Sequence, residues 1–301
     1  MVDLDERAKS ATLGDVGRLS PEAQQLLRHV IWPIVRLCHR PVLEGAENLP
    51  EQGPYLLVAN HSAGLGVAEI LTFASLAATR LSHVRIAGFA HPTSFRFWPT
   101  NVLLRHFGAI PSTYEAADRT LTSGVPILVF PGGDHETLRP IWQAHRVDFG
   151  GRLGFLKIAR KAGVPVVPMG IRGSHFTAPM LIRSKLLSVG LLAPRYLLGT
   201  KRWALSLLGL VGALGLCATP VSWPVRIALI YAWLGSPLVM APYIPATIRI
   251  RIGEPLSPES LFREGTDEEL PRALDRVQGV IQGLVTGESQ ASLLGPRNSE
   301  S

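Results

Sequence analysis

The chain of 301 residues is long enough to bury one large hydrophobic core, and its composition excludes several classes of protein. Its formal net charge is +7 and its mean hydropathy is +0.22, and Lys and Arg are dispersed, so no nucleic-acid partner is expected. This balance favours contact with anionic lipid headgroups or with a phosphate-bearing co-substrate. A basic surface with no specific partner explains the charge equally well.

The first residues and the cysteines indicate a cytoplasmic protein without metal. Cys38 and Cys217 have no spacing that suits a disulfide framework or a zinc site, so neither is expected. Residues 1–19 begin with an acidic stretch, lack the apolar run of a secretory signal and are expected to be disordered. We therefore expect the active domain to face the cytoplasm.

Residues 20–41 are predicted to form an amphipathic, basic helix. Ser20 suits the N-cap and Pro21 the first helical position, and Pro33 is expected to kink the helix. The apolar residues of one stripe are Leu26, Leu27, Val30, Ile31, Ile34, Val35 and Cys38. A membrane surface and the domain's own core are equally suitable partners for this stripe.

Residues 42–285 are predicted to form one α/β domain, a mixed sheet covered by helices. The apolar runs that suggest strands are Tyr55–Ala59, Val84–Phe89, Pro126–Phe130 and Val164–Met169. The helical patterns between them are Val67–Thr79, Phe95–His106, Tyr114–Ser123 and Leu153–Lys161. Thr247–Ile252 alternates as an edge strand, Asp267–Leu284 is predicted to be a helix, and residues 286–301 are predicted to be a flexible tail.

An apolar insertion at residues 203–245 interrupts this domain. Its first half is at the short limit of a spanning helix, and its second half is broken by three prolines. We therefore expect a helical hairpin that dips into one leaflet, with a hairpin buried in the core as the alternative. The aromatic residues expected at the membrane interface are Trp203, Trp223, Trp233 and Tyr243.

Chemistry is indicated where His61 follows the first apolar strand. Open α/β sheets bind ligands at strand ends, and Gly64 and Gly66 would allow a substrate to approach the backbone. Glu69, in the first turns of the next helix, is positioned to orient the imidazole as a general base. A helix-capping or core histidine is the alternative.

A second candidate segment, Phe130-Pro131-Gly132-Gly133-Asp134-His135-Glu136, follows another apolar strand. Its paired glycines expose backbone N–H groups that suit an anion or an oxyanion. An ordinary strand-ending turn explains Pro-Gly-Gly equally well.

Ordered blocks along the chain resemble the lysophosphatidic acid acyltransferase (PlsC-type) superfamily. These are Leu43 to Pro50, Leu56 to Ser62, Phe107 to Pro111, Val129 to Gly133, Val164 to Pro168 and Ile252 to Pro255. The resemblance implies a membrane-bound enzyme that transfers a fatty acyl group from acyl-CoA or acyl-carrier protein to a lipid hydroxyl. It implies no cofactor and no covalent acyl-enzyme, and it assigns the catalytic base to His61.

The chain departs from the family pattern at three positions. Gly66 stands where the aspartate of His-x4-Asp is expected, and Glu69 matches relatives whose acid lies eight residues after the histidine. Tyr114 replaces an arginine, and Phe-Pro-Gly-Gly-Asp-His replaces Phe-Pro-Glu-Gly-Thr-Arg, which resembles the diacylglycerol acyltransferase-like branch. A phosphate-bearing acceptor is therefore less favoured, although Arg119, Arg139 and Arg152 are available to restore the charge.

Together these observations predict a membrane-associated acyltransferase on the cytoplasmic face. The predicted catalytic residues are His61 and Glu69, and the predicted substrate-binding residues are Asn60, Ser62, Pro131, Gly132, Gly133, Glu136 and Arg139. The acceptor is expected to be a neutral glycerolipid or a lysophospholipid. A non-catalytic lipid-binding protein with the same fold, or an acyl-thioester hydrolase, is the alternative.

Overall fold

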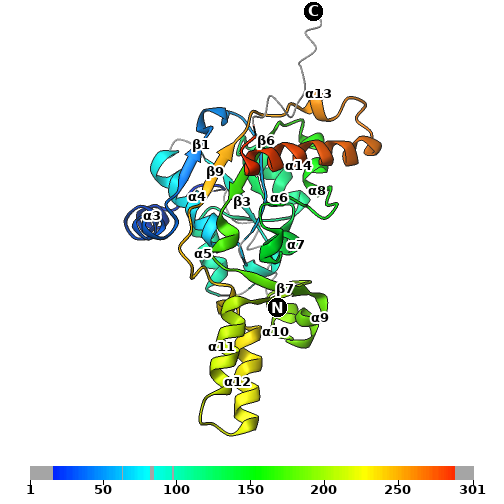
Figure 1. The fold of residues 1–301 in the computed structure, drawn as a ribbon. Coiled ribbons are helices and arrows are strands. Elements are labelled where there is room, and N and C mark those ends of the chain that lie inside the picture. The colour runs from blue at the N-terminus through cyan, green and yellow to red at the C-terminus, as the bar shows by residue number, and fades with distance from the viewer. Residues whose placement is uncertain (1–15, 63, 82–84, 97, 289–301) are drawn as a thin grey trace, which may run out of the picture.

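A seven-stranded sheet forms the centre of the molecule, in a computed structural model that describes residues 16–62, 64–81, 85–96 and 98–288 (Figure 1). The strand order is β1-β9-β6-β2-β5-β3-β4. The strands are β1 (Val42–Glu44), β2 (Leu56–Ala59), β3 (Ala87–Ala90), β4 (Ile110–Pro111), β5 (Ile127–Val129), β6 (Val166–Arg172) and β9 (Arg249–Ile252). Neighbours pair in parallel except β6 with β9, which confirms the predicted mixed sheet.

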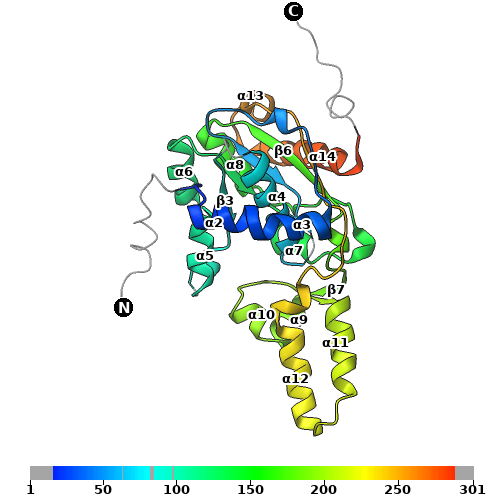
Figure 2. The ribbon, with the colours of Figure 1, turned by 90° about the vertical axis from the view of Figure 1, so that its left-hand side faces the viewer.

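Helices cover both faces of this sheet. The helices are α2 (Pro21–Leu26), α3 (Trp32–His39), α4 (Val67–Arg80), α5 (Thr100–His106), α6 (Tyr114–Thr122), α7 (Gly133–Thr137), α8 (Gly154–Ala162), α9 (Lys185–Gly190), α10 (Ala193–Tyr196), α11 (Leu207–Cys217), α12 (Trp223–Gly235), α13 (Pro258–Leu261) and α14 (Leu270–Thr286). Short 3₁₀ segments lie at Ala46–Asn48, Pro92–Phe95, Ile141–Gln143, Ser174–Phe176, Pro237–Met240 and Asp267–Glu269. Because side chains alternate along a strand, Leu56 and Val58 pack with α6, α8 and α14, whereas Leu57 and Ala59 pack with α4 (Figure 2).

The strand predicted at Thr247–Ile252 was wrongly placed at the edge of the sheet. Residues Arg249–Ile252 lie between β1 and β6, so both sides of this strand are paired. The alternation of Arg and Ile arises because Arg249 and Arg251 face Glu44 on β1, with Nε to carboxylate oxygen distances of 3.3 and 2.6 Å. The basic face of this strand is therefore paired in part with its neighbour β1, and Arg249 also stays partly exposed to solvent.

The N-terminal helical segment packs on α4 and leaves an apolar row uncovered. Ser20 caps it, its Oγ accepting from the Ala23 N–H at 3.1 Å, and a π-helical turn at Leu27–Ile31 precedes Pro33. A wider turn at this point accommodates a proline that has no N–H to donate. Leu27 and Val35 are buried, but the side chains Leu26, Val30, Ile34 and Leu37 are 39 to 79% exposed. The predicted stripe therefore divides between the core and the surface.

The apolar insertion begins with a strand and then projects as a hairpin. β8 (Trp203–Ser206) pairs antiparallel with β7 (Met180–Ser184), and α11 and α12 extend side by side away from the body (Figures 1 and 2). Trp203 was predicted at a membrane interface, which is wrong: it is fully buried, and its Nε1 donates to the carbonyl of Leu234 at 2.8 Å. Within the described residues, no helix has the length and apolarity needed to cross a bilayer.

The residues outside the described part include most of both predicted terminal segments. Residues 1–15 and 289–301 lie there, so the expected disorder of residues 1–19 and of the tail stays a prediction. The helix predicted at Asp267–Leu284 is present as a 3₁₀ turn followed by α14.

Candidate active site

The candidate site lies at the carboxyl ends of β6, β2 and β5, three neighbouring strands in the middle of the sheet. β2 pairs in parallel with both other strands, so the loops that follow them emerge together. These loops carry His61, Gly132 and Ser174 respectively. The site therefore occupies the position that open α/β sheets generally offer to ligands.

The imidazole of His61 is held by Glu69. The Nδ1 of His61 and Oε1 of Glu69 are hydrogen-bonded, and the carboxylate is fully buried whereas the His61 side chain is 11% exposed. The ring of His61 stacks on Phe130, with centroids 4.3 Å apart and planes 24° apart. Among the described residues, none hydrogen-bonds to Nε2. A carboxylate on Nδ1 directs the basic lone pair of a neutral imidazole to Nε2, which leaves that atom for a substrate.

Gly66 makes room for this ring. A Cβ atom at position 66 would lie 1.9 Å from Cε1 of His61, and Gly66 has φ +74°, a left-handed conformation that favours glycine. Gly66 was expected to let a substrate approach the backbone. In the structure, the imidazole of His61 fills the space beside it instead.

Asn60 and Ser62, on either side of the histidine, bind protein groups. The side chain of Asn60 accepts from the N–H of Ile171 at 2.7 Å and donates to its carbonyl at 2.8 Å, which joins the ends of β2 and β6. The hydroxyl of Ser62 donates to Oε2 of Glu69 at 3.0 Å and is hydrogen-bonded to Ser174, and the Ser62 N–H donates to Oε1 at 2.8 Å. The role in substrate binding that was predicted for both residues stays a prediction.

The Pro131-Gly132-Gly133 turn is anchored by Arg152. Nη1 of Arg152 donates to the carbonyls of Pro131 at 3.0 Å and of Gly132 at 2.7 Å, and Nη2 pairs with Asp134 at 2.7 Å. The N–H of Gly133 donates to the carbonyl of Phe130 at 3.3 Å. The N–H of Gly132 has no acceptor within the part of the chain that the structure describes.

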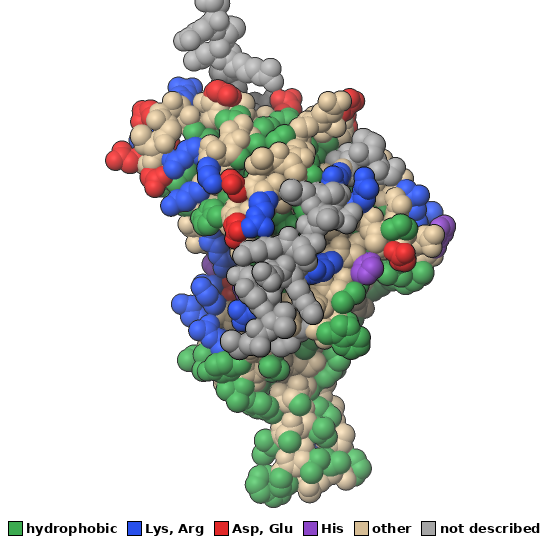
Figure 3. All heavy atoms as spheres, turned by 180° about the vertical axis from the view of Figure 1, so that it is seen from behind, with side chains coloured by type: hydrophobic (Ala, Val, Ile, Leu, Met, Phe, Trp, Pro, Cys, Tyr) green, Lys and Arg blue, Asp and Glu red, His purple; other side chains and the backbone are tan. Residues whose placement is uncertain are grey.

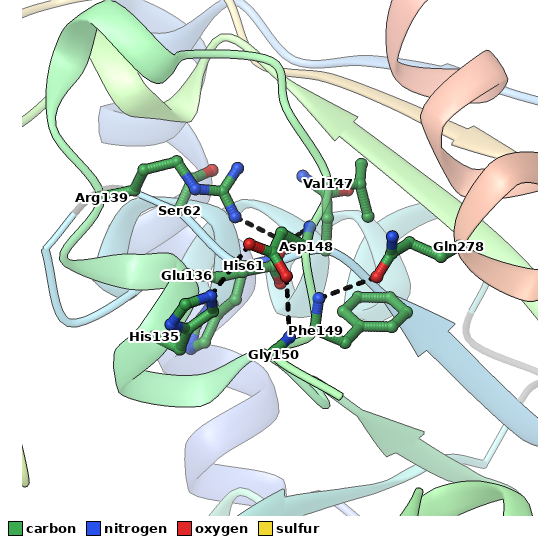
Figure 4. Close-up of polar contacts among 12 residues, drawn as sticks. His61, Ser62, His135, Glu136, Arg139, Val147, Asp148, Phe149, Gly150 and Gln278 are labelled. Carbon is green, nitrogen blue, oxygen red and sulfur yellow. Dashed lines mark hydrogen bonds and ion pairs between the residues drawn. The ribbon is translucent and has the colours of Figure 1, made fainter. Parts of the chain in front are cut away.

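Glu136 lies beside Gly132 of this turn and contacts the histidine loop, and Figure 4 shows it next to His61, Arg139 and Asp148. Its Oε2 accepts from the N–H of His61 at 3.0 Å, and its Oε1 accepts from the N–H of Asp148 at 3.0 Å and from Nη2 of Arg139 at 3.1 Å. Glu136 is fully buried and Arg139 is 2% exposed. Burial raises the pKa of Glu136 to about 7, although the N–H of Asp148, the Arg139 charge and the N–H of His61 each act to lower it.

Three residues of this cluster have no counterpart among the predicted site residues. Ser174 bonds to Ser62, Asp148 bonds to Glu136 through its N–H, and the buried His175 has a pKa lowered to about 3 by desolvation and by the charges of Arg139 and His145. Ser174 was accessible to prediction, because it follows the end of β6 in the same way that His61 follows β2. Asp148 contributes its main chain, which no residue pattern marks.

A protein-family model matches the part of the chain that contains this site. Residues 40–172 match the family model described as Acyltransferase, and this span includes every predicted site residue. This part of the chain is therefore similar to the acyltransferase family, and residues 173–301 lie outside the match.

Curated relatives are similar over part of their length. An uncharacterized protein of Mycobacterium tuberculosis is 29% identical over 205 residues, which are 68% of this chain and 53% of that protein. Phytyl ester synthase 2 of Arabidopsis thaliana is 27% identical over 48% of this chain and 21% of its own length. The DGAT1/2-independent enzyme synthesizing storage lipids of Bos taurus is 29% identical over 44% of this chain and 38% of its own. The chain thus spans about half or less of the length of these relatives.

A search of solved structures finds the 1-acyl-sn-glycerophosphate (LPA) acyltransferase PlsC from Thermotoga maritima. It aligns with a TM-score of 0.46 and 20% sequence identity, covering 94% of this chain and 83% of that one.

Proposed function

We propose that this protein transfers a fatty acyl group from an acyl thioester, acyl-CoA or acyl-carrier protein, to a lipid hydroxyl. The observation that carries the proposal is the pair of His61 and Glu69, in which Nδ1 is bound by a buried carboxylate and Nε2 has no protein partner among the described residues. Such a histidine is oriented to act as a general base. A scaffold protein that had lost its catalytic pair would not need this geometry.

In the proposed reaction, Nε2 of His61 removes the proton of the acceptor hydroxyl while the hydroxyl oxygen attacks the thioester carbonyl. The resulting oxyanion is stabilised by the backbone N–H of Gly132, which has no acceptor among the described residues, whereas the N–H of Gly133 is already bonded to the carbonyl of Phe130. Its collapse breaks the carbon–sulfur bond, and the imidazolium returns its proton to the leaving thiolate. The products are an ester and a free thiol, and no acyl-enzyme forms.

A neutral acceptor is favoured over a phosphate-bearing one. Arg139 and Arg152 are engaged by Glu136 and by the Gly132 turn, and Arg119 forms an exposed ion pair with Glu115. Each of these three arginines is therefore already engaged by a protein acceptor. The names of two relatives, a phytyl ester synthase and an enzyme synthesizing storage lipids, are consistent with a neutral lipid alcohol.

We further propose that the protein works at the cytoplasmic surface of a membrane through its projecting hairpin. The hairpin is apolar on all sides, with Leu214 62% and Trp223 71% exposed, and Figure 3 shows hydrophobic side chains gathered over this end. At 1.5 Å per residue the 11 residues of α11 extend about 16 Å, roughly half of the hydrocarbon thickness of a bilayer. Arg226, near the hairpin turn, donates to the carbonyls of Thr219 and Val221, so its charged group is already partnered at the tip.

Charge supports a lipid partner for this end of the molecule. Residues 177–248 include Arg183, Lys185, Arg195, Lys201, Arg202 and Arg226 but no Asp or Glu. Basic residues near the base of an apolar hairpin suit a bilayer with anionic headgroups, because the hairpin contacts the lipid tails and the cations pair with the phosphates.

Acyl transfer is tested with protein in liposomes, labelled acyl-CoA or acyl-carrier protein, and a panel of diacylglycerol, monoacylglycerol, phytol and lysophospholipids. We expect a labelled ester with a neutral alcohol, loss of that product in His61→Ala, and unchanged activity in the control His29→Ala, an exposed histidine on the N-terminal segment. Absence of ester with every acceptor would contradict the proposal. Labelled free fatty acid formed regardless of acceptor would instead indicate a thioester hydrolase.

Membrane association is tested separately by vesicle flotation. We expect Leu214→Glu and Trp223→Glu to reduce binding, and Trp142→Glu, which alters an equally exposed tryptophan on the body, to leave it unchanged. If all three variants bind vesicles equally well, the hairpin is not the part of the protein that contacts the membrane.

A further inference from the structure

Two motif positions that are acidic in the family resembled are glycine in this chain. Gly66 stands at the aspartate position of His-x4-Asp, and Gly132 stands at the glutamate position of Phe-Pro-Glu-Gly-Thr-Arg. In each case a glutamate follows after about one helical turn, three residues later as Glu69 and four residues later as Glu136. Both glutamates are fully buried at the candidate site.

The space beside Gly132 is filled by the side chain of Glu136. A Cβ atom on Gly132 would lie 2.2 Å from Oε2, 2.4 Å from Cγ and 2.5 Å from Cδ of Glu136. The backbone of Gly132 has φ −64° and ψ −32°, which any residue adopts, so its conformation does not require glycine. The side chain of Glu136 therefore excludes a larger residue there.

We infer that Glu136 supplies from α7 the carboxylate that Gly132 lacks, and that it acts as a positioning residue by holding the main chain of His61. The two glutamates then divide the work: Glu69 binds the imidazole at Nδ1, and Glu136 binds the N–H of the same residue. Of the three tests below, only the one that measures acyl transfer depends on the proposed function.

The surroundings of Glu136 require an acceptor with two oxygens. Two main-chain N–H groups and the guanidinium of Arg139 converge on it (Figure 4), and within the part of the chain that the structure describes neither N–H group has a second acceptor. Because Arg139 is buried, removing the carboxylate leaves a cation without its counter-charge and an N–H of His61 without its acceptor. The loop that carries the base is thereby linked to the loop that carries Gly132.

The first test measures the His61 main chain and needs no activity. In hydrogen–deuterium exchange of the segment that contains His61, Glu136→Ala should accelerate exchange by roughly tenfold, since the hydrogen bond that the His61 N–H donates to Glu136 is lost. Glu115→Ala, which removes an exposed acid on α6, is the control and should leave this segment unchanged.

The second test measures the shared space by a double-mutant cycle of unfolding in urea. Gly132→Ala should destabilise the protein when Glu136 is present and be nearly neutral in the Glu136→Ala background, because the clashing atoms are then gone. Equal effects of Gly132→Ala in both backgrounds, or exchange at His61 that Glu136→Ala does not alter, would overturn the inference whether or not the protein is an enzyme.

The third test uses acyl transfer. Glu136→Ala should lower kcat by about tenfold or more with little change in KM for the acyl donor, since His61 is displaced and no substrate contact is lost. Gly132→Glu combined with Glu136→Ala returns the carboxylate to the family's position and should recover part of that kcat. A change in KM alone, or a double variant no better than Glu136→Ala, would show that Glu136 binds substrate or only anchors α7.

Discussion

The α-carbon of Gly66 lies against the imidazole ring of His61. A Cβ atom there would be 1.9 Å from Cε1 and 2.8 Å from each ring nitrogen. Aspartate at position 66 is thus incompatible with the observed position of the ring. The carboxylate that binds Nδ1 comes instead from Glu69, which lies within the first turn of α4. Loss of the expected acid and gain of the later one are two aspects of a single arrangement.

Gly66→Ala should therefore reduce kcat strongly. The added methyl group displaces the imidazole, and a misplacement of about 1 Å in a catalytic group costs on the order of 100-fold in rate. The measurement is steady-state acyl transfer in liposomes, with circular dichroism to establish that the variant is folded.

The control for this variant is Gly163→Ala at the end of α8. Gly163 has φ +62°, so alanine there suffers similar backbone strain, but no atom lies within 4 Å of the added Cβ. We expect a loss of stability in both variants and a loss of kcat only in Gly66→Ala. Similar losses of kcat would show that strain, rather than contact with His61, is responsible.

Much of the fold could be predicted because its strands are apolar and its helices amphipathic. β2, β5 and β6 were found as apolar runs, and α4, α6 and α8 lie within a residue or two of their predicted bounds. Which strands become neighbours in a sheet, however, depends on contacts between residues that are distant in sequence. The placement of β9 between β1 and β6, parallel to β1 and antiparallel to β6, and the strand at Trp203–Ser206 were therefore not predicted.

One contact of the candidate site was predictable from local sequence, and the others were not. The spacing of His61 and Glu69 on a strand end and a helix start indicated their pairing, which the structure contains. That Glu136 meets the main chain of His61, 75 residues earlier, follows from the parallel pairing of β2 and β5 and from the side chain that Gly132 lacks. The strand pairing and the space beside Gly132 are not expressed in local sequence.

Asn60→Ala should reduce stability more than catalysis. The side chain satisfies both the N–H and the carbonyl of the buried residue Ile171, and each buried group left unpaired costs about 1–3 kcal/mol. Urea unfolding should show this loss, whereas KM for the acyl donor should be unchanged. Gln25→Ala, an exposed amide on α2, serves as the control. A raised KM at full stability would instead support substrate binding by Asn60.

Replacing Lys185, Arg195 and Lys201 together with glutamine should weaken binding to anionic vesicles. All three side chains are exposed at the root of the hairpin, and each cation near an anionic surface contributes about 1 kcal/mol, so the loss should approach roughly 100-fold. Binding to uncharged phosphatidylcholine vesicles should change little. The same replacement of Lys157, Lys161 and Arg272, on α8 and α14, is the control, and equal losses in both sets would indicate attraction to net charge alone.

Glu136→Gln should change how stability depends on pH. Burial raises the pKa of Glu136 from 4.5 to about 7, so between these values the folded protein retains a proton that the unfolded chain has released. The contribution of Glu136 to stability is therefore complete below about pH 4.5 and is lost as the pH rises through about 7. Glutamine does not titrate, so the stability of the native chain relative to the variant should fall across this range and stay constant above it.

The measurement is urea unfolding of both proteins at about pH 5, 6, 7 and 8. His175, whose pKa is lowered to about 3, contributes the opposite slope below about pH 6.5, but it is present in both proteins and cancels in their difference. A difference that stays flat from pH 5 to 8 would contradict the prediction, because it would mean that the two N–H donors and Arg139 offset desolvation and hold the pKa of Glu136 at or below its ordinary value.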